Sequence, residues 1–216
     1  MICALYIDTL ALGPLQTNCY ILFEPTSNRA VVVDPADEGE RIWKTLQEKG
    51  WILEKILITH GHFDHIGGVA ALKGLSGAEV WIHEKDSGML ENAEKNYSSF
   101  VGAPYACRKA DGYLEDGQII SIGSSEIRVL ETPGHTPGGV SFVGDSFVIV
   151  GDTLFEGGVG RTDFPGSSSL QLLESIQQKL LVLDDDTRVY PGHGPYTTIG
   201  RERRENPWLA ANASFI

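Results

Sequence analysis

Three runs of consecutive apolar residues limit the folds open to this 216-residue chain. They are Val31-Val32-Val33, Ile56-Leu57-Ile58 and Phe147-Val148-Ile149-Val150. Because successive side chains of a strand point to opposite faces, strands without polar alternation are buried on both faces. Helical periodicity occurs in both halves, at residues 37–49 and 169–181, so helices are available to cover the sheets. We therefore expect an α/β fold in which two sheets pack face to face, each with helices on its outer face.

The remaining elements are predicted from apolar patterning and from Gly, Pro and Asn turn signals. Strands are expected at residues 4–10, 19–23, 30–33, 53–58, 79–82, 118–122, 126–131, 139–143, 147–150 and 187–190. Further helices are expected at residues 67–75, 84–92 and 201–205, and Ser168 with Gln171 resembles a capping box before the helix at 169–181. No linker or low-complexity segment divides residues 1–216, which predicts a single domain. The pattern weakens between residues 84 and 111, where we expect a wall or lid of a substrate site.

The chain is acidic, with a formal net charge of −12 and a pI of 4.8. This argues against nucleic acid as a partner, because proteins that bind polyphosphates normally carry a basic surface. The densest basic group consists of Arg201, Arg203 and Arg204. It is interleaved with Glu202 and Glu205, and we interpret it as a solvated helix face.

Neither a membrane partner nor secretion is expected. The apolar runs are short, and the N-terminus lacks the basic start of a signal peptide and is interrupted by Asp8. The three cysteines, Cys3, Cys19 and Cys107, are far apart and odd in number. They are typical of reduced thiols that pack inside a cytoplasmic protein. No feature of the sequence indicates an oligomeric state.

A histidine cluster follows the second apolar run. Within Thr59-His60-Gly61-His62-Phe63-Asp64-His65-Ile66-Gly67-Gly68, three histidines and an aspartate fall in six residues. Strand alternation predicts His60 and His62 on one side, and a following helix would turn Asp64 and His65 toward a second position. Imidazole and carboxylate together suit zinc, iron or manganese better than calcium or magnesium. The cluster therefore predicts a two-metal hydrolytic centre.

Three later strand ends carry similar residues. His135 stands in Thr132-Pro133-Gly134-His135-Thr136-Pro137-Gly138, His193 in Tyr190-Pro191-Gly192-His193-Gly194-Pro195, and Asp152 in Val150-Gly151-Asp152-Thr153. Five of the six histidines thus follow predicted strands in Gly-flanked segments, which favours one site at a sheet edge. His83 stands alone and is interpreted as structural. Asp34, in Val33-Asp34-Pro35, is either a turn start or a residue that orients a ligand histidine.

The motif Thr59-His60-Gly61-His62-Phe63-Asp64-His65, followed in order by the His135, Asp152 and His193 segments, resembles the signature of the metallo-β-lactamase superfamily. The resemblance covers nearly the whole chain. Gly151-Asp152-Thr153-Leu154-Phe155 and the later Gly158-Val159-Gly160-Arg161 look closest to its small glyoxalase-II-like members. It implies a four-layer αββα sandwich, in agreement with the layers expected from the apolar runs.

The resemblance also implies a ligand set. It assigns His60, His62 and His135 to a first metal, Asp64, His65 and His193 to a second, and Asp152 to a bridging position. Two divalent ions are thus expected per chain, with zinc as the first expectation and iron or manganese as alternatives. Asp64 and Asp152 are the implied catalytic carboxylates, Asp64 by orienting a hydroxide that the two ions share.

The activity implied is hydrolysis of a small-molecule thioester such as an S-(hydroxyacyl)glutathione. Arg161 stands where that family contacts the glutathione carboxylate, although it could instead form an ion pair with Asp163. The chain departs from glyoxalase II in ending soon after Asn206-Pro207-Trp208 and in its Gly194-Pro195-Tyr196 segment. Another thioester, or a lactone, would meet the same chemistry.

Other activities of the fold are kept as alternatives. A persulfide dioxygenase would use the first-site ligands alone, on one iron, and the run Gly160-Arg161-Thr162-Asp163-Phe164 favours it as second choice. A true β-lactamase is not expected without a secretion signal or a cysteine near the second metal. A non-enzymatic metal-binding module would require closed metal sites, and the predicted ligand set looks open.

Overall fold

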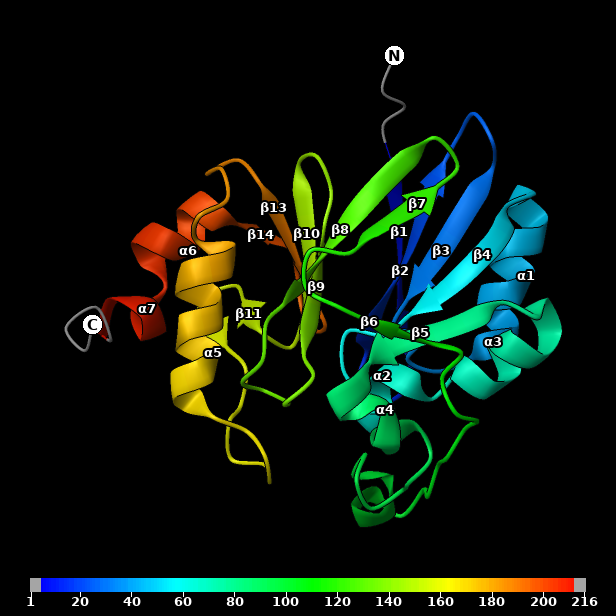
Figure 1. Ribbon diagram of the computed structural model, residues 1–216, viewed down its shortest axis with the longest axis horizontal. Helices are drawn as coiled ribbons and strands as arrows, with labels where there is room; N and C mark the ends of the chain where they lie inside the picture. Colours follow the sequence, from blue (N-terminus) through cyan, green and yellow to red (C-terminus); the bar gives the residue numbers. More distant parts are fainter. Residues whose placement is uncertain (1–4, 212–216) are drawn as a thin grey trace.

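Two six-stranded sheets pack face to face in the computed structural model, which describes residues 5–211 (Figure 1). The first sheet has the order β1-β2-β3-β4-β5-β6. Its strands are β1 Tyr6–Leu12, β2 Thr17–Glu24, β3 Arg29–Val33, β4 Ile52–Leu57, β5 Glu79–His83 and β6 Gly112–Leu114. The pairs from β1 to β3 are antiparallel, and those from β3 to β6 are parallel.

The second sheet has the order β14-β13-β10-β9-β8-β7. Its strands are β7 Ile119–Ile122, β8 Ser125–Glu131, β9 Val140–Val143, β10 Phe147–Gly151, β13 Arg188–Pro191 and β14 Thr197–Thr198. Only the β10–β13 pair is parallel. A small hairpin, β11 Leu154–Phe155 with β12 Gly158–Val159, lies outside both sheets.

Helices cover the outer face of each sheet (Figure 1). α1 Gly39–Lys49 and α3 Val69–Ser76 lie on the first sheet. α5 Ser169–Ser175, which continues as a π-helical turn at Ile176–Leu180, lies on the second with α6 Ile199–Glu205 and α7 Pro207–Ala211. α2 Phe63–Ile66, α4 Glu84–Leu90 and the 3-10 helix Ser98–Val101 gather at one end of the sheets.

Three layers of buried side chains separate the four structural layers. Ile56 packs toward α1 and α3, whereas its neighbour Leu57 packs between the sheets. In the second sheet Ile149 lies between the sheets, and Val148 packs toward α5 and α6. The runs are therefore buried on both faces, and the predicted αββα sandwich is confirmed.

Several element boundaries differ from the predictions. β1 begins and ends later than the strand predicted at residues 4–10, and Ala4 lies outside the described residues. The helix predicted at 67–75 is α3, which begins two residues later and ends one residue later than predicted. The separate short helix α2 precedes it, before Gly67-Gly68. The sequence did not predict the five-residue helix α7 or the short strands β6, β11, β12 and β14, because segments of two to five residues cannot display a periodic pattern.

The basic run of α6 is exposed, as predicted, and Arg201 pairs with Glu205 at 3.3 Å. The prediction was wrong for Glu202, whose side chain is buried. Its carboxylate accepts hydrogen bonds from the Thr197 hydroxyl at 2.6 Å and from the Asn206 amide at 2.8 Å. Glu202 therefore packs inside the protein although its neighbours in the charged run are exposed, because its face of the helix points to β14.

Cys19 is buried in the layer under α1, and Cys107 packs against the edge of that layer, which confirms the predicted packing role. Cys3 lies outside the described residues. Among residues 5–211, no helix is long and apolar enough to cross a membrane.

Candidate metal centre

The chain segments that follow five strands meet at the end of the sheets where α2 and α4 lie (Figure 1). β3 leads into Asp34 and β4 into His60. From the other sheet, β8 leads to His135, β10 to Asp152 and β13 to His193. Both sheets thus contribute to one site, as predicted from the strand-end placement of these residues.

The first group consists of His60, His62 and His135, whose facing ring nitrogens lie within 4.8 Å of one another. His62 Nδ1 is 2.9 Å from His135 Nε2. The strand alternation predicted for His60 and His62 was wrong, since β4 ends at Leu57 and both residues lie in the loop before α2. The conformation of this loop, and not the alternation of a strand, places His60 and His62 on the same side.

The second group consists of Asp64, His65 and His193, which also place one ligand atom each within 4.8 Å of the others. Asp64 and His65 lie on α2, as expected for side chains turned away from His60 and His62 by a helix. Asp64 Oδ2 is 3.1 Å from His193 Nε2 and 3.8 Å from His65 Nε2.

Asp152 lies between the two groups. Its Oδ2 is 3.7 Å from Nε2 of His135, in the first group, and 3.7 Å from Nε2 of His193, in the second. Its Oδ1 is 3.3 Å from His65 Nε2. A carboxylate in this place can reach both groups at once, as the bridging prediction requires.

Unpartnered buried atoms test whether metal ions fit here. Within the described part of the chain, His60 Nε2, His65 Nε2 and Asp152 Oδ1 are buried without a hydrogen-bond partner. Such atoms are uncommon in folded proteins, since each loses its contacts with water. All three belong to the same cluster of imidazoles and carboxylates, which is a donor set for zinc, iron or manganese. The cluster therefore fits divalent ions.

Two histidines of the first group, His60 and His62, are held in the neutral form that coordinates metals. Burial, reinforced by the neighbouring imidazoles, lowers the pKa of His60 well below its usual value. Burial and His135 lower the pKa of His62 to about 3. Neutral imidazoles keep a lone pair for a metal ion, so these two histidines require no loss of protons near neutral pH.

The second group is electrostatically different. Burial lowers the pKa of His65, but the carboxylates of Asp152, Asp64 and Asp34 outweigh burial and hold that pKa well above its usual value. The hydrogen bond to Asp64 raises the pKa of His193. A metal ion at this group must therefore displace protons that the carboxylates stabilise.

Two histidines are oriented through their second ring nitrogen. His135 Nδ1 lies 2.8 Å from the backbone oxygen of Arg161, and His65 Nδ1 lies 2.8 Å from Asp34 Oδ2. Asp34 also accepts hydrogen bonds from the Thr59 backbone at 2.7 Å and its hydroxyl at 2.6 Å. Of the two roles left open by the sequence, the contact with His65 identifies Asp34 as an orienting residue.

Asp86 is a residue of the site that the sequence analysis missed. Its buried carboxylate accepts hydrogen bonds from Gly61 N at 3.2 Å and from Gly138 N at 2.7 Å. These backbone groups belong to the loops that carry the first three histidines. No motif marks Asp86, since it lies on α4 inside the segment where the sequence pattern weakened.

The start of β2 also contributes to the site and was missed by the sequence analysis. Thr17 donates a hydrogen bond to Asp64 Oδ2 at 3.2 Å. Asn18 Nδ2 donates to the backbone oxygens of Pro191 at 3.0 Å and Gly194 at 2.9 Å, on either side of His193. β2 of the first sheet thereby fixes the turn around His193, which follows a strand of the second sheet. The local sequence of β2 gives no sign of this contact.

Two glycines are required by close approach. A Cβ at Gly192 would lie 2.2 Å from Asp152 Oδ1 and 2.6 Å from His65 Cε1. Gly151 has a φ of 52°, and a Cβ there would lie 2.4 Å from the Thr59 hydroxyl. A side chain at Gly192 would therefore displace Asp152 or His65, and one at Gly151 would displace Thr59.

The cluster opens into a pocket of about 720 Å³. Its lining includes one guanidinium, that of Arg161, and the aromatic side chains of Tyr97, Phe100, Phe155 and Phe164. Within the segment 84–111, where a wall of the substrate site was predicted, Tyr97 and the 3-10 helix line this pocket. Arg161 pairs with Asp163 at 2.8 Å and lies over the Phe164 ring at 4.7 Å, so it has both the ion pair and the pocket position considered from sequence.

His83 lies outside both groups. Its Nε2 is 3.1 Å from Glu131 Oε1, and its Nδ1 accepts a hydrogen bond from Lys85 N at the start of α4. These contacts agree with the structural role predicted for it.

A model of the metallo-β-lactamase superfamily matches residues 12–193, the span from the end of β1 through the last histidine. The chain belongs to that superfamily. Among curated proteins it is 38% identical over 212 residues to the hydroxyacylglutathione hydrolase GloC of Haemophilus influenzae, covering 94% of this chain and 97% of that one. It is therefore a metallo-hydrolase by family, and the predicted resemblance is confirmed.

Three solved structures agree with this chain in fold. The BLEG-1 B3 metallo-β-lactamase superposes with a TM-score of 0.90 at 38% identity, covering 94% of this chain and 99% of that one. TTHA1623 in a di-iron-bound form gives a TM-score of 0.80 at 38% identity, with 94% and 100% coverage. ETHE1 from Myxococcus xanthus gives 0.79 at 29% identity, with 95% and 85% coverage.

Proposed function

We propose that this protein hydrolyses small-molecule thioesters, with S-(hydroxyacyl)glutathiones as the leading substrates, and that it does so with two divalent ions. The observation that carries the proposal is Asp152, placed between two three-residue groups at the base of the 720 Å³ pocket. The extensive match to GloC, which is named for this activity, supports the choice of substrate class.

His60, His62 and His135 would hold one ion, Asp64, His65 and His193 the other, with Asp152 between them. Zinc is proposed first. The likeness to a di-iron form of TTHA1623 supports iron as an alternative. Ions bound there supply Lewis-acid activation of a water molecule and of the thioester carbonyl.

The residues themselves position the reactants. Asp64 faces the pocket, and its Oδ2 is fixed by the Thr17 hydroxyl at 3.2 Å, so the carboxylate can orient an attacking water. Asp34 fixes the His65 ring, and the Arg161 backbone oxygen fixes His135. A thiolate is a good leaving group, so the site requires no strong general acid.

Arg161 and the aromatic rings of the same pocket would receive the thiol part of the substrate. The guanidinium lies 4.7 Å from the Phe164 ring centre and is largely exposed at the pocket edge. A carboxylate of glutathione can exchange with Asp163 for this guanidinium, since an exposed ion pair contributes little to stability.

The test is hydrolysis of S-lactoylglutathione, followed by release of free thiol, together with metal analysis of the same preparation. The expected result is thiol release with two metals per chain. Failure to cleave this or any other thioester would contradict the proposal.

A persulfide dioxygenase is the second candidate. The Gly160-Arg161-Thr162-Asp163-Phe164 run and the likeness to ETHE1 favour it, and it would need only the first group with one iron. One iron per chain with oxygen uptake on glutathione persulfide, and no thioester cleavage, would establish it instead. The likeness to BLEG-1 makes β-lactam hydrolysis a third assay, although the sequence did not lead us to expect it.

A further inference from the structure

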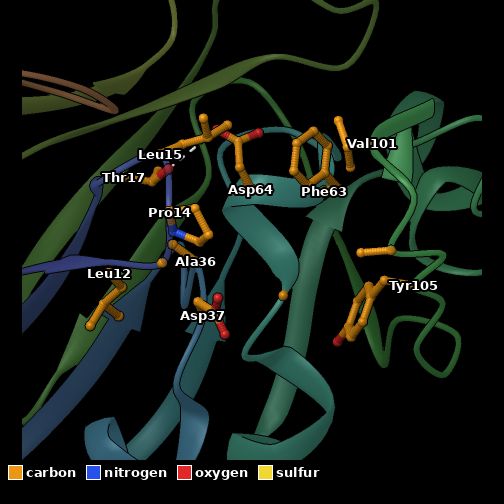
Figure 2. A pocket seen from close by; sticks show the side chains of 13 residues that line it. Leu12, Pro14, Leu15, Thr17, Ala36, Asp37, Phe63, Asp64, Val101 and Tyr105 are labelled. Atoms are coloured by element: carbon orange, nitrogen blue, oxygen red, sulfur yellow. Dashed lines mark hydrogen bonds between the residues drawn. The ribbon is translucent and has the colours of Figure 1, made fainter. Parts of the chain in front are cut away.

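A second cavity adjoins the metal centre on the far side of Asp64. It has a volume of about 420 Å³, within the range of small-molecule pockets. Figure 2 shows its walls: Leu12, Pro14, Leu15 and Ala36 on one side, and Phe63, Val101 and Tyr105 on the other. The cavity therefore lies between the β1–β2 turn and the loop that follows the 3-10 helix, alongside α2.

The two cavities are continuous in their lining. Leu15, Phe63, Asp64 and Val101 border both the 420 Å³ cavity and the 720 Å³ pocket. Leu15 and Val101 are 54% and 57% exposed, which is unusual for large apolar side chains. A molecule whose reacting carbon lies at the metal centre can thus extend a group past Asp64 into the second cavity.

The chemistry of the second cavity is apolar and without positive charge. Its lining contains no Lys, Arg or His, and its charged side chains are Asp37 and Asp64. Among the described residues, Asp37 has no ion-pair partner, and its Oδ1 accepts a hydrogen bond only from the neighbouring Glu38 N. An anionic group would therefore be repelled here, whereas an uncharged hydrocarbon would be desolvated favourably.

Charge also decides which half of a thioester enters each cavity. Glutathione carries two carboxylates, so it is matched by Arg161 in the larger pocket and opposed by Asp37 in the smaller one. The acyl half is left for the smaller cavity. A lactoyl group is too small and too polar to make use of an apolar space of this volume.

We infer that the cavity between the β1–β2 turn and the 101–105 loop is an acyl-binding site, which selects thioesters with uncharged apolar acyl groups larger than lactoyl. This inference rests on the proposed thioesterase function, and within the thioester class it shifts the preferred acyl group from a small hydroxyacyl group to a larger apolar one. Tyr105 keeps the far wall in place, since its hydroxyl accepts a hydrogen bond from Ala70 N at 3.1 Å.

The test compares acetyl, butanoyl and hexanoyl thioesters of glutathione, with succinyl glutathione as the charged counterpart of the butanoyl compound. The expected kcat/KM rises about fourfold for each methylene added, and on the order of 10² from acetyl to hexanoyl. Succinyl glutathione should fall below butanoyl. Equal kcat/KM for the acetyl and hexanoyl compounds would overturn the inference while leaving the thioesterase proposal intact.

Two variants fill the cavity from opposite walls. Ala103 and Pro14 are exposed residues that line this cavity and not the larger pocket. Ala103→Trp and Pro14→Trp should each lower the hexanoyl-to-acetyl ratio of kcat/KM at least tenfold. Ala103→Ser, which leaves the space open, should keep the ratio. A ratio unchanged in both tryptophan variants would contradict the acyl site.

Binding of thioethers separates this inference from the proposed activity. S-Hexylglutathione and S-methylglutathione cannot be hydrolysed, so their dissociation constants do not depend on turnover. If no thioester is cleaved, tighter binding of the hexyl compound that is lost in Ala103→Trp would still support the cavity. Equal binding of the two compounds would overturn it.

Discussion

Asp86 links the two loops that carry the first histidine group. Its Oδ1 accepts from Gly138 N, and its Oδ2 from Gly61 N, so one side chain serves a loop from each sheet. The carboxylate is buried, and burial is the main cause of its raised pKa. Replacing one oxygen by an NH₂ group would set two donors against each other at a buried position.

We predict that Asp86→Asn lowers metal occupancy of the first group and reduces activity about 10- to 100-fold, the usual effect of losing a residue that orients metal ligands. Metal content per chain and kcat/KM on a thioester measure this. Asp145→Asn, an exposed carboxylate of the β9–β10 turn, is the control and should change neither. Full metal content in Asp86→Asn would count against the role.

Asp152 Oδ2 lies 3.7 Å from a histidine of each group, His135 in the first and His193 in the second. We predict that Asp152→Ala binds fewer than two metals and loses more than about 100-fold in turnover, since the carboxylate that joins the groups is removed. Metal analysis and kcat check this. A variant that kept both metals and full turnover would refute the bridging assignment.

Arg161 is expected to affect substrate binding rather than chemistry. Removing the guanidinium in Arg161→Ala should raise KM for a glutathione thioester about tenfold and leave kcat within about twofold, because a contact equal in ground and transition states changes only KM. Arg29→Ala, at an exposed ion pair with Glu54 in the first sheet, is the matched control. A drop in kcat without a change in KM would contradict this role.

At the scale of elements, long segments were predictable and short ones were not. The helix start at Ser168 was read correctly, since its hydroxyl accepts from Gln171 N at 3.3 Å. By contrast, β6 has only three residues, and it joins the sheet because Gly112 leaves room for the Trp81 ring. That pairing is between distant segments, so local patterning could not show it.

The same division applies to the candidate site. The seven expected ligands could be predicted from the sequence because each belongs to a motif that contains Gly or Pro and follows a predicted strand. Asp86 and Asn18 act on backbone groups of loops that lie far away in sequence. Such contacts depend on how the sheets pack, so the sequence alone carries no signal for them.

The β2–β3 turn offers a pH-dependent test of element stability. Glu24 is buried at the end of β2, and its carboxylate accepts from Thr26 N, Ser27 N and the Ser27 hydroxyl. These hydrogen bonds, that of Ser27 foremost, lower the pKa of Glu24 from 4.5 to about 2. The stability that it contributes is therefore fully present above pH 4.5 and is lost as the pH falls toward 2.

We predict that Glu24→Gln lowers the melting temperature by several degrees at pH 7, since the amide cannot accept all of these hydrogen bonds. The difference from the parent protein should shrink steadily as the pH falls from 4.5 toward 2, where the carboxyl group becomes neutral as well. Thermal unfolding followed by circular dichroism at several pH values measures it. A difference independent of pH would mean that shape, not charge, explains the effect.

At the scale of the whole molecule, the candidate metal centre spans the interface between the two sheets. His60, His62, Asp64 and His65 follow β4 of the first sheet, whereas His135, Asp152 and His193 follow strands of the second. The apolar layer between the sheets is continuous, but at this end it gives way to polar side chains. Bound ions would therefore join the sheets where apolar packing is absent.

Metal removal should for this reason destabilise the fold as a whole. Ions present at about a thousand times their dissociation constant stabilise the folded state by about 4 kcal/mol, which corresponds to roughly 8–16 °C in melting temperature for a chain of this size. We predict a fall of this order on chelation, reversed by zinc, iron or manganese and not by magnesium, which prefers oxygen ligands. His193→Ala, lacking one second-group ligand, should show a smaller fall. An unchanged melting temperature after complete metal removal would show that the apolar layers alone hold the sheets together.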